Sequence, residues 1–144
     1  MQNVWQESPN SRLKLWRKFR KELSLIDDDD QVLHAIIDWW KGAPIESRIL
    51  DCYNSDNWPD PWELIYNDKY DDNTVALGMC YTMDLIDWPC TLQLIQCNKK
   101  SEIKLILNID DVYILNYTYG IINDIDDISH CEILQSWESN ELTK

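Results

Sequence analysis

Five cysteines and two histidines are the residues of this chain that could carry nucleophilic chemistry. A catalytic cysteine needs a lowered pKa, which a helix N-terminus or a nearby imidazolium supplies. Cys80 stands in "LGMCYTM", well inside a predicted helix, and the effect of a helix dipole fades beyond the first turn. Cys80 is therefore predicted to be a small buried residue. The alternative is a cysteine-dependent amidase or peptidase, in which Cys80 contacts His34 or His130 from across the fold.

Neither histidine forms an evident pair with a cysteine in the sequence. His34 lies in "QVLHAIIDWW", where a partly buried structural histidine is expected. His130 and Cys131 are neighbours at the start of a predicted strand, and adjacent strand residues point to opposite faces of a sheet. They are therefore not expected to share a site directly.

Five aspartates stand in two short acidic stretches whose carboxylates could bind a hard cation such as Ca²⁺. They are Asp71, Asp72, Asp124, Asp126 and Asp127. No run matches the D-x-D-x-D-G calcium loop, and no cysteine pair has the C-x-x-C spacing of a zinc site. With only three glycines, a loop that cradles phosphate is not expected either. The sequence predicts no metal and no cofactor, and the carboxylates are interpreted as solvated surface.

Helices that come first and strands that follow must position these residues. The helices expected from apolar spacing and capping residues span about 11–25, 29–40, 60–65 and 71–86. The strands expected from β-branched and aromatic alternation span 90–97, 102–109, 111–117 and 130–137. Gly78, inside the last helix, predicts that another element packs closely there. The order favours an α+β fold, with N-terminal helices packed on a small antiparallel β-meander.

The net charge of −13 is unevenly placed, because residues 1–24 hold six basic and only two acidic residues. The strongly acidic body repels phosphates and anionic lipids, so no nucleic-acid contact by the body and no membrane binding are expected. The basic helix could dock on an acidic neighbour or be a solvated face. A start Met without an apolar signal segment predicts a cytosolic chain with reduced cysteines.

The aromatic residues are eight Trp and seven Tyr but a single Phe. Trp and Tyr combine apolar area with a polar edge and are enriched at interfaces. Either an aromatic-rich core or a partner could use them. The residues predicted to form an interface are Trp5, Trp16, Arg17, Arg20, Trp58 and Trp62.

The stretch "WPDPWELI" (58–65), followed by "YDDNTVALGMCYTM" (70–83), resembles the transglutaminase-like, papain-like cysteine peptidases of bacteria and their phages. That family has a W-x-x-P-x-E-x-L approach and a G-D-C-E-D-Y-A segment that opens a helix. In register, Asp71 matches the family's aspartate and Ala76 its helix alanine. The likeness covers roughly residues 30–120 and implies a transglutaminase-like core.

The resemblance puts another residue at each catalytic position of that family. Asp72 stands for the cysteine, Lys104 for the histidine and Asn116 for the aspartate. A carboxylate cannot replace a thiolate in acyl transfer, and a cationic lysine is a poor general base. The prediction is a degenerate site without catalytic residues, at which Asp71 and Asp72 cap the following helix.

The resulting hypothesis is a non-catalytic structural or connector protein of a tailed-phage virion, at the neck, tail or baseplate. Its expected partners are other virion proteins or copies of itself. Its expected location is the virion, and the host cytoplasm during assembly. Residues 1–27 are predicted to be a basic arm and helix, and residues 28–144 a single domain. Besides the Cys80 amidase, an acidic phage protein that inhibits a host factor is an alternative.

Overall fold

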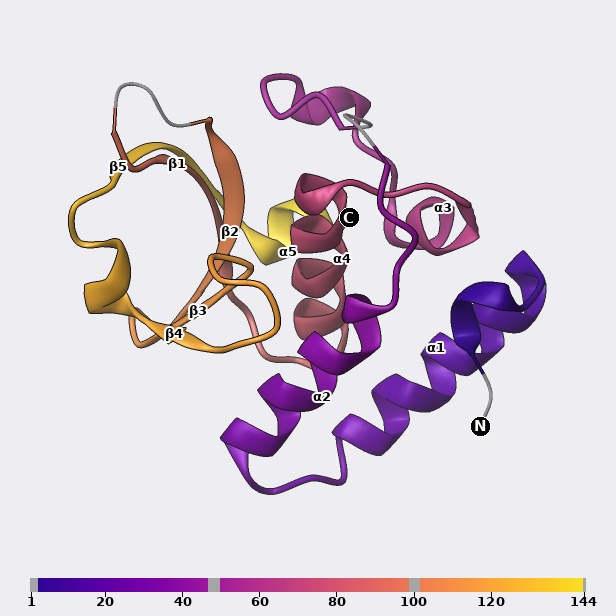
Figure 1. Cartoon of the computed structure of the whole chain (residues 1–144). Coiled ribbons are helices and arrows are strands. Elements are labelled where there is room, and N and C mark those ends of the chain that lie inside the picture. Colours follow the sequence, from indigo (N-terminus) through magenta and orange to yellow (C-terminus); the bar gives the residue numbers. More distant parts are fainter. Residues whose placement is uncertain (1–2, 47–49, 99–101, 144) are drawn as a thin grey trace.

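The computed structural model describes residues 3–46, 50–98 and 102–143. Within these ranges, most helices occupy the first part of the chain, and the second part holds a five-stranded sheet and two short helices (Figure 1). The helices are η1 (Val4–Gln6), α1 (Pro9–Leu23), α2 (Asp29–Lys41), η2 (Ser55–Asn57), α3 (Pro61–Tyr66), α4 (Asp72–Leu85), η3 (Ile125–Ile128) and α5 (Ser139–Leu142). The strands are β1 (Thr91–Gln96), β2 (Lys104–Ile109), β3 (Tyr113–Leu115), β4 (Asn123–Asp124) and β5 (Glu132–Glu138). The predicted α+β fold is confirmed.

Side-chain caps set where the longer helices begin, because they satisfy N–H groups that have no partner inside the helix. The Ser8 hydroxyl accepts from the backbone N–H of Ser11 and starts α1 at Pro9, earlier than the cap predicted at Ser11. Helices α2, α3 and α4 are capped by Asp28, Asp60 and Asp71.

The strands pair antiparallel in the order β4-β3-β2-β1-β5. Strand β5, the last in the chain, therefore lies beside β1, at the opposite edge of the sheet from β4. The predicted strand over 111–117 is shorter, because Asp111 and Asn116 adopt positive φ angles of 54° and 68°. The predicted strand over 130–137 begins only at Glu132, so His130 and Cys131 lie in the turn before it.

Helix α4 packs on one face of the sheet, and its middle is sealed from solvent. Every residue of 74–83 is buried. Gly78 faces the indole of Trp40 so closely that a Cβ atom would overlap the ring, which is the close packing that a mid-helix glycine predicts. The Thr82 hydroxyl accepts from Nε1 of Trp16 and Nε1 of Trp40, both at 3.2 Å, and donates to the Gly78 carbonyl. These contacts fix α1 and α2 against α4.

The other face of the sheet carries a smaller apolar cluster. Its buried members are Ile95, Ile106, Ile114 and Ile128. The last of these comes from η3. Cys97, Tyr117 and Cys131 pack against the edge of this cluster.

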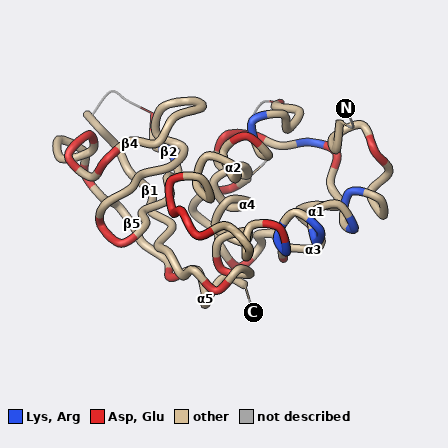
Figure 2. Tube along the Cα trace, turned by 90° about the horizontal axis from the view of Figure 1, so that it is seen from below, with Lys and Arg blue, Asp and Glu red and all other residues tan. Residues whose placement is uncertain are grey.

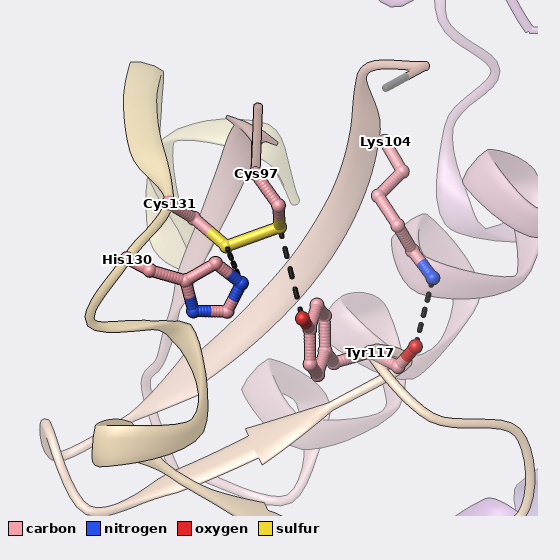
Figure 3. The surroundings of a disulfide bond; sticks show 5 residues. All are labelled: Cys97, Lys104, Tyr117, His130 and Cys131. Carbon is pink, nitrogen blue, oxygen red and sulfur yellow. Dashed lines mark hydrogen bonds between the residues drawn. A yellow bond between two sulfur atoms is a disulfide. The ribbon is translucent and has the colours of Figure 1, made fainter. Parts of the chain in front are cut away.

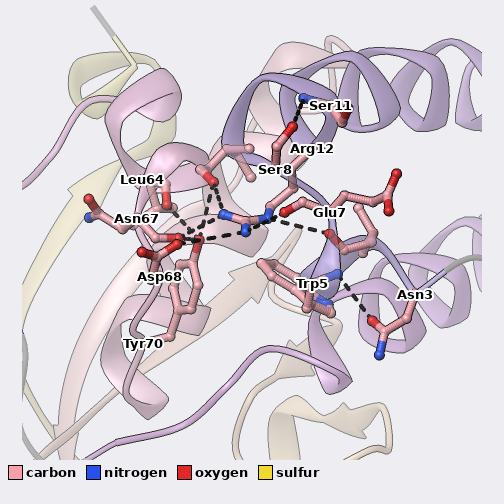
Figure 4. A network of polar contacts seen from close by, with 12 residues as sticks. Asn3, Trp5, Glu7, Ser8, Ser11, Arg12, Leu64, Asn67, Asp68 and Tyr70 are labelled. Carbon is pink, nitrogen blue, oxygen red and sulfur yellow. Dashed lines mark hydrogen bonds and ion pairs between the residues drawn. The ribbon is translucent and has the colours of Figure 1, made fainter.

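A buried arginine ties the N-terminal segment to α3 (Figure 4). Arg12 is 3% exposed, and its guanidinium donates to the carbonyl oxygens of Ile65 at 2.8 Å and Asn67 at 2.9 Å. A buried charge needs such acceptors, since it has lost its water. These contacts hold residues of the 1–27 segment against the 28–144 segment. The predicted domain boundary between the two stays a prediction.

Lysines and arginines gather on α1, whereas carboxylates are spread over much of the remaining chain (Figure 2). This is the uneven charge that the sequence indicates. Among the described residues, no helix is both long enough and apolar enough to cross a membrane.

Candidate functional site

The first turn of α4 presents two consecutive carboxylates with different roles. Asp71 is 8% exposed, and its Oδ1 accepts from the backbone N–H and the hydroxyl of Thr74 at 2.7 and 2.6 Å. Its Oδ2 accepts from the backbone N–H of Leu50 at 3.1 Å. Asp72 follows at the first helical position and is exposed. Asp71 therefore caps the helix and anchors the segment at residue 50, while the Asp72 carboxylate faces solvent.

Lys104 and Asn116 lie beside Asp72. The Asn116 amide Nδ2 donates to the carbonyl oxygens of Asp72 at 2.9 Å and Leu105 at 3.1 Å. Lys104 Nζ donates to the carbonyl of Tyr117 at 3.0 Å. Burial lowers the pKa of Lys104, and the Asp72 carboxylate acts in the opposite direction. The three positions that the resemblance matched thus meet at one place.

An open groove of about 960 Å³ runs past this place. We call it the acidic groove. Among the described residues, the charged ones that line it are Glu46, Asp51, Asp71, Asp72, Glu102 and Lys104. The aromatic ring of Tyr53, which is 72% exposed, also lines it. Among these described residues carboxylates outnumber the lysine, even with Glu46 paired to Lys69 at 3.7 Å, and this part of the lining favours a cationic ligand.

A small cavity of about 30 Å³ lies on the other side of Asp72 and is mainly apolar. Trp40, Val75 and Met79 contribute to its lining. Its rim includes Ile45, Tyr119 and Ile121, whose side chains are 53%, 74% and 48% exposed. A chain laid across Asp72 would therefore meet carboxylates on one side and apolar surface on the other.

Cys80 does not join this site. It is 0% exposed in the sealed part of α4. A hydrogen bond with Cys90 and then burial raise its pKa well above the usual thiol value, whereas a nucleophile needs the opposite shift. His34 and His130 are both exposed at the surface. The geometry therefore does not support the Cys80 amidase.

A second group of reactive side chains lies at the end of β1 (Figure 3). Cys97 and Cys131 form a disulfide, and the His130 Nε2 lies 3.7 Å from the Cys131 Sγ. The sequence predicts reduced cysteines and no direct contact between His130 and Cys131. The first expectation is wrong for Cys97 and Cys131, which meet because β5 lies beside β1, whereas Cys52, Cys80 and Cys90 are thiols. The second is wrong because His130 and Cys131 sit in a turn, where the alternation of a strand does not apply.

The aromatic residues predicted to face a partner are used largely inside the chain. Trp16 is 0% exposed, so it presents no surface. Arg17 is exposed, as is Trp62 at 49%. The Arg20 guanidinium carbon lies 4.4 Å from the ring centre of Trp16 and 5.4 Å from that of Trp62. Contact of this surface with a partner stays a prediction.

Trp5 and Trp58 are half-buried. Their indole N–H groups donate to the carbonyl oxygens of Trp39 at 3.0 Å and Asp51 at 2.7 Å. Both side chains therefore serve the packing of this chain, and a further contact with a partner stays a prediction.

Sequence reasoning missed the far wall of the acidic groove. Glu46, Asp51 and Glu102 come from segments distant from α4. Ile45 forms an isolated bridge with Tyr70, and the Glu46 backbone N–H donates to the Tyr70 carbonyl at 2.7 Å. This pairing draws the segment after α2 alongside the start of α4. No local pattern in the sequence marks it.

No protein-family model matches the chain, and no curated protein matches it. Among solved structures, the chain is similar to Legionella pneumophila LapG, with a TM-score of 0.69 and 14% sequence identity. The match covers 92% of this chain and 77% of LapG. LapG is a transglutaminase-like cysteine protease.

The prediction that the chain is not an enzyme is corrected by these findings. LapG is a cysteine protease with this fold, and the described residues bring cysteine and histidine together at Cys131 and His130. The prediction of a non-enzyme is therefore not upheld. The inference rested on Asp72, Lys104 and Asn116, so it bears only on the catalytic positions that the resemblance matched and not on other parts of the chain. The chain thus has an α+β fold with a transglutaminase-like core.

Proposed function

We propose that the protein binds an extended, basic segment of polypeptide in the acidic groove, across the N-terminus of α4. The observation that carries the proposal is the set of carboxylates around Asp72. Exposed or partly exposed members of this set would pair with lysine or arginine side chains of the ligand. The volume of about 960 Å³ lies within the range of ligand sites in proteins.

The ligand would carry an apolar residue next to its basic residues. The exposed ring of Tyr53 lies on the acidic side and offers a face to a cation. Tyr119 and Ile121 border the apolar cavity on the other side of Asp72. A basic residue followed by an apolar one would contact both halves. The apolar residue would rest on the exposed Tyr119 and Ile121 rather than enter the cavity, which has room for little more than water. The cysteine protease activity of LapG, a protein of the same fold, supports a polypeptide as the ligand class.

The test is the affinity of a fluorescent peptide with two arginines followed by leucine, measured by anisotropy. Wild type is expected to bind this peptide. It is not expected to bind the same peptide with glutamates in place of the arginines. The double variant Asp51→Asn/Asp72→Asn is expected to bind about tenfold more weakly, equal to about 1.4 kcal/mol. Increasing salt should weaken the complex.

The matched control is Asp38→Asn/Asp87→Asn, which removes the same charge from exposed positions outside the groove. It should bind like wild type. Equal affinity for the acidic peptide, or equal losses in both double variants, would contradict the proposal. Mass spectrometry of the same incubation tests whether the peptide is cut, and a product that disappears in Asp72→Asn would assign a reaction to the groove.

A second candidate is protein–protein assembly through the exposed surface of α1 and α3. Trp62 and Tyr66 are 49% and 51% exposed there, and the Arg20 guanidinium lies over the Trp62 ring. This candidate retains the sequence-based expectation of contacts with virion proteins or copies of the chain. Sedimentation at increasing concentration tests self-association: a larger species that disappears in Trp62→Ser supports it, and a monomer throughout contradicts it.

A further inference from the structure

The cluster formed by Cys97, His130 and Cys131 lies apart from the acidic groove and is built by the pairing of β1 with β5 (Figure 3). Gln96 pairs with Glu132 at the end of this ladder. The residue after β1 and the residue before β5 are therefore opposite each other, and both are cysteines.

The turn before β5 adds the histidine. The Cys131 backbone N–H donates to the Ile128 carbonyl at 2.9 Å, which folds the chain back after η3. His130 consequently turns its ring toward the sulfur atoms, with Nε2 3.7 Å from the Cys131 Sγ. One ligand atom from each of the three residues lies within 4.8 Å of the other two.

Two thiolates and an imidazole are a donor set that Zn²⁺ binds, with Zn–S and Zn–N bonds of about 2.3 and 2.0 Å. Donor atoms this close together can reach one ion after a small movement. Both cysteines are half-buried at the edge of the apolar cluster, whereas His130 is exposed. Such a setting holds the sulfur atoms in place and leaves one side open to an ion from solvent.

We infer that Cys97, His130 and Cys131 form a redox-controlled zinc site. In the oxidised state the two sulfur atoms are bonded to each other and cannot act as thiolate ligands. In the reduced state they bind Zn²⁺ together with His130. Three protein ligands leave the fourth tetrahedral position to water, the pattern of zinc sites that keep an open position.

The change of state needs a reductant, and a dithiol supplies it. The dithiol gives two electrons and two protons and becomes a disulfide itself. The bond between the Cys97 and Cys131 sulfur atoms breaks, and two thiols form. Zn²⁺ then replaces the two thiol protons, which leave to solvent. Oxidation of the pair reverses the sequence and releases the metal.

The test uses the full chain, reduced with a phosphine, separated from the reductant without oxygen, and titrated with Co²⁺ as a spectroscopic probe. One equivalent of Co²⁺ per chain should give a thiolate-to-cobalt charge-transfer band, and Zn²⁺ should abolish it. The oxidised protein should give no band. Cys131→Ser should lose the band, and His130→Ala should bind more than about tenfold more weakly, since loss of even an outer-shell partner costs about 10–100-fold.

His34→Ala is the matched control, because it removes an exposed imidazole on α2 and should leave the titration unchanged. His130 is exposed and outside the disulfide, so His130→Ala tests the site even if the cysteine variants fold poorly. The inference is overturned if the reduced wild type gives no band. It is also overturned if the band persists in Cys131→Ser, which would place the metal on other cysteines, or if His130→Ala binds as tightly as wild type.

Discussion

The first turn of α4 and the middle of α4 belong to one helix but offer opposite environments. The first turn carries Asp71 and Asp72 at the edge of an open groove. The middle carries Gly78, Cys80 and Thr82, all enclosed by α1, α2 and the sheet. The residue type with the most reactive side chain, cysteine, is in the enclosed part, whereas the exposed position beside Lys104 holds a carboxylate.

This contrast shows that the position along the helix decides the chemistry more than the residue type does. Within α4, only the first turn borders the acidic groove, and its exposed Asp72 carboxylate offers a negative charge to a cationic ligand. Burial and the hydrogen bond with Cys90 raise the pKa of Cys80. A thiol in the middle of α4 is therefore a packing residue, and the first turn is where a ligand can act.

The largest effect is expected from Gly78→Ala. In an open helix this change would stabilise by about 1 kcal/mol. Here the new Cβ would overlap the ring of Trp40, which is 1% exposed and cannot move freely. We expect a loss of about 3 kcal/mol in the free energy of unfolding, measured by urea denaturation. Trp40→Leu in the Gly78→Ala background should recover part of the loss. A gain in stability for Gly78→Ala would contradict the close packing.

Thr82→Val should cost about 2 kcal/mol in the same measurement. The methyl group keeps the volume, but the indole N–H groups of Trp16 and Trp40 both lose their acceptor in a buried place. Thr82→Ser is the matched control, because it keeps the hydroxyl. Equal stability of the valine and serine variants would mean that the shared hydroxyl does not hold α1 and α2 on α4.

Asp71→Ala should cost about 1–2 kcal/mol, because it removes the cap of α4 and the acceptor for the Leu50 N–H. Asp72→Asn, one residue further, should change stability by less than about 0.5 kcal/mol, since Asp72 is exposed. Thermal unfolding of both variants compares the two carboxylates directly. Equal losses would contradict their assignment to different roles.

The smallest effect is expected at Lys104. Burial lowers its pKa below the ordinary value of 10.5, and Asp72 partly offsets this. Because the folded pKa is below the unfolded one, the charged amine destabilises the fold at neutral pH, and this cost shrinks as the pH rises from the folded pKa to the unfolded one. Asp72→Asn should lower the pKa further.

NMR titration of methyl-labelled lysines measures this shift, with the exposed Lys69 as the reference. A Lys104 pKa that rises or stays constant in Asp72→Asn would show that the two groups do not interact.

Local patterns predicted much of this fold. Aspartates before apolar helical spacing marked α2, α3 and α4, and Gly78 indicated the contact that Trp40 makes. The register against a known family brought Asp72, Lys104 and Asn116 to one place, although their roles stay a prediction. Each of these inferences depends on residues close in sequence or on a spacing that the fold preserves.

The features that sequence reasoning missed depend on contacts between distant segments. The disulfide joins residues 34 positions apart and requires β5 to lie beside β1. The contact of His130 with Cys131 depends on a strand that begins two residues later than expected. The wall of the acidic groove depends on the bridge between Ile45 and Tyr70. Periodicity cannot reveal such pairings, because it reports only which face of an element is apolar.

Backbone amide NMR during titration with the arginine–leucine peptide is the most direct test of the proposal that ligands bind at the first turn of α4. The account predicts concentration-dependent shifts at Asp51, Asp72 and Lys104, with further shifts at Tyr119. The amides of Gly78 and Cys80 should change little. Shifts confined to the exposed surface of α1 and α3, or no shifts at saturating peptide, would contradict it.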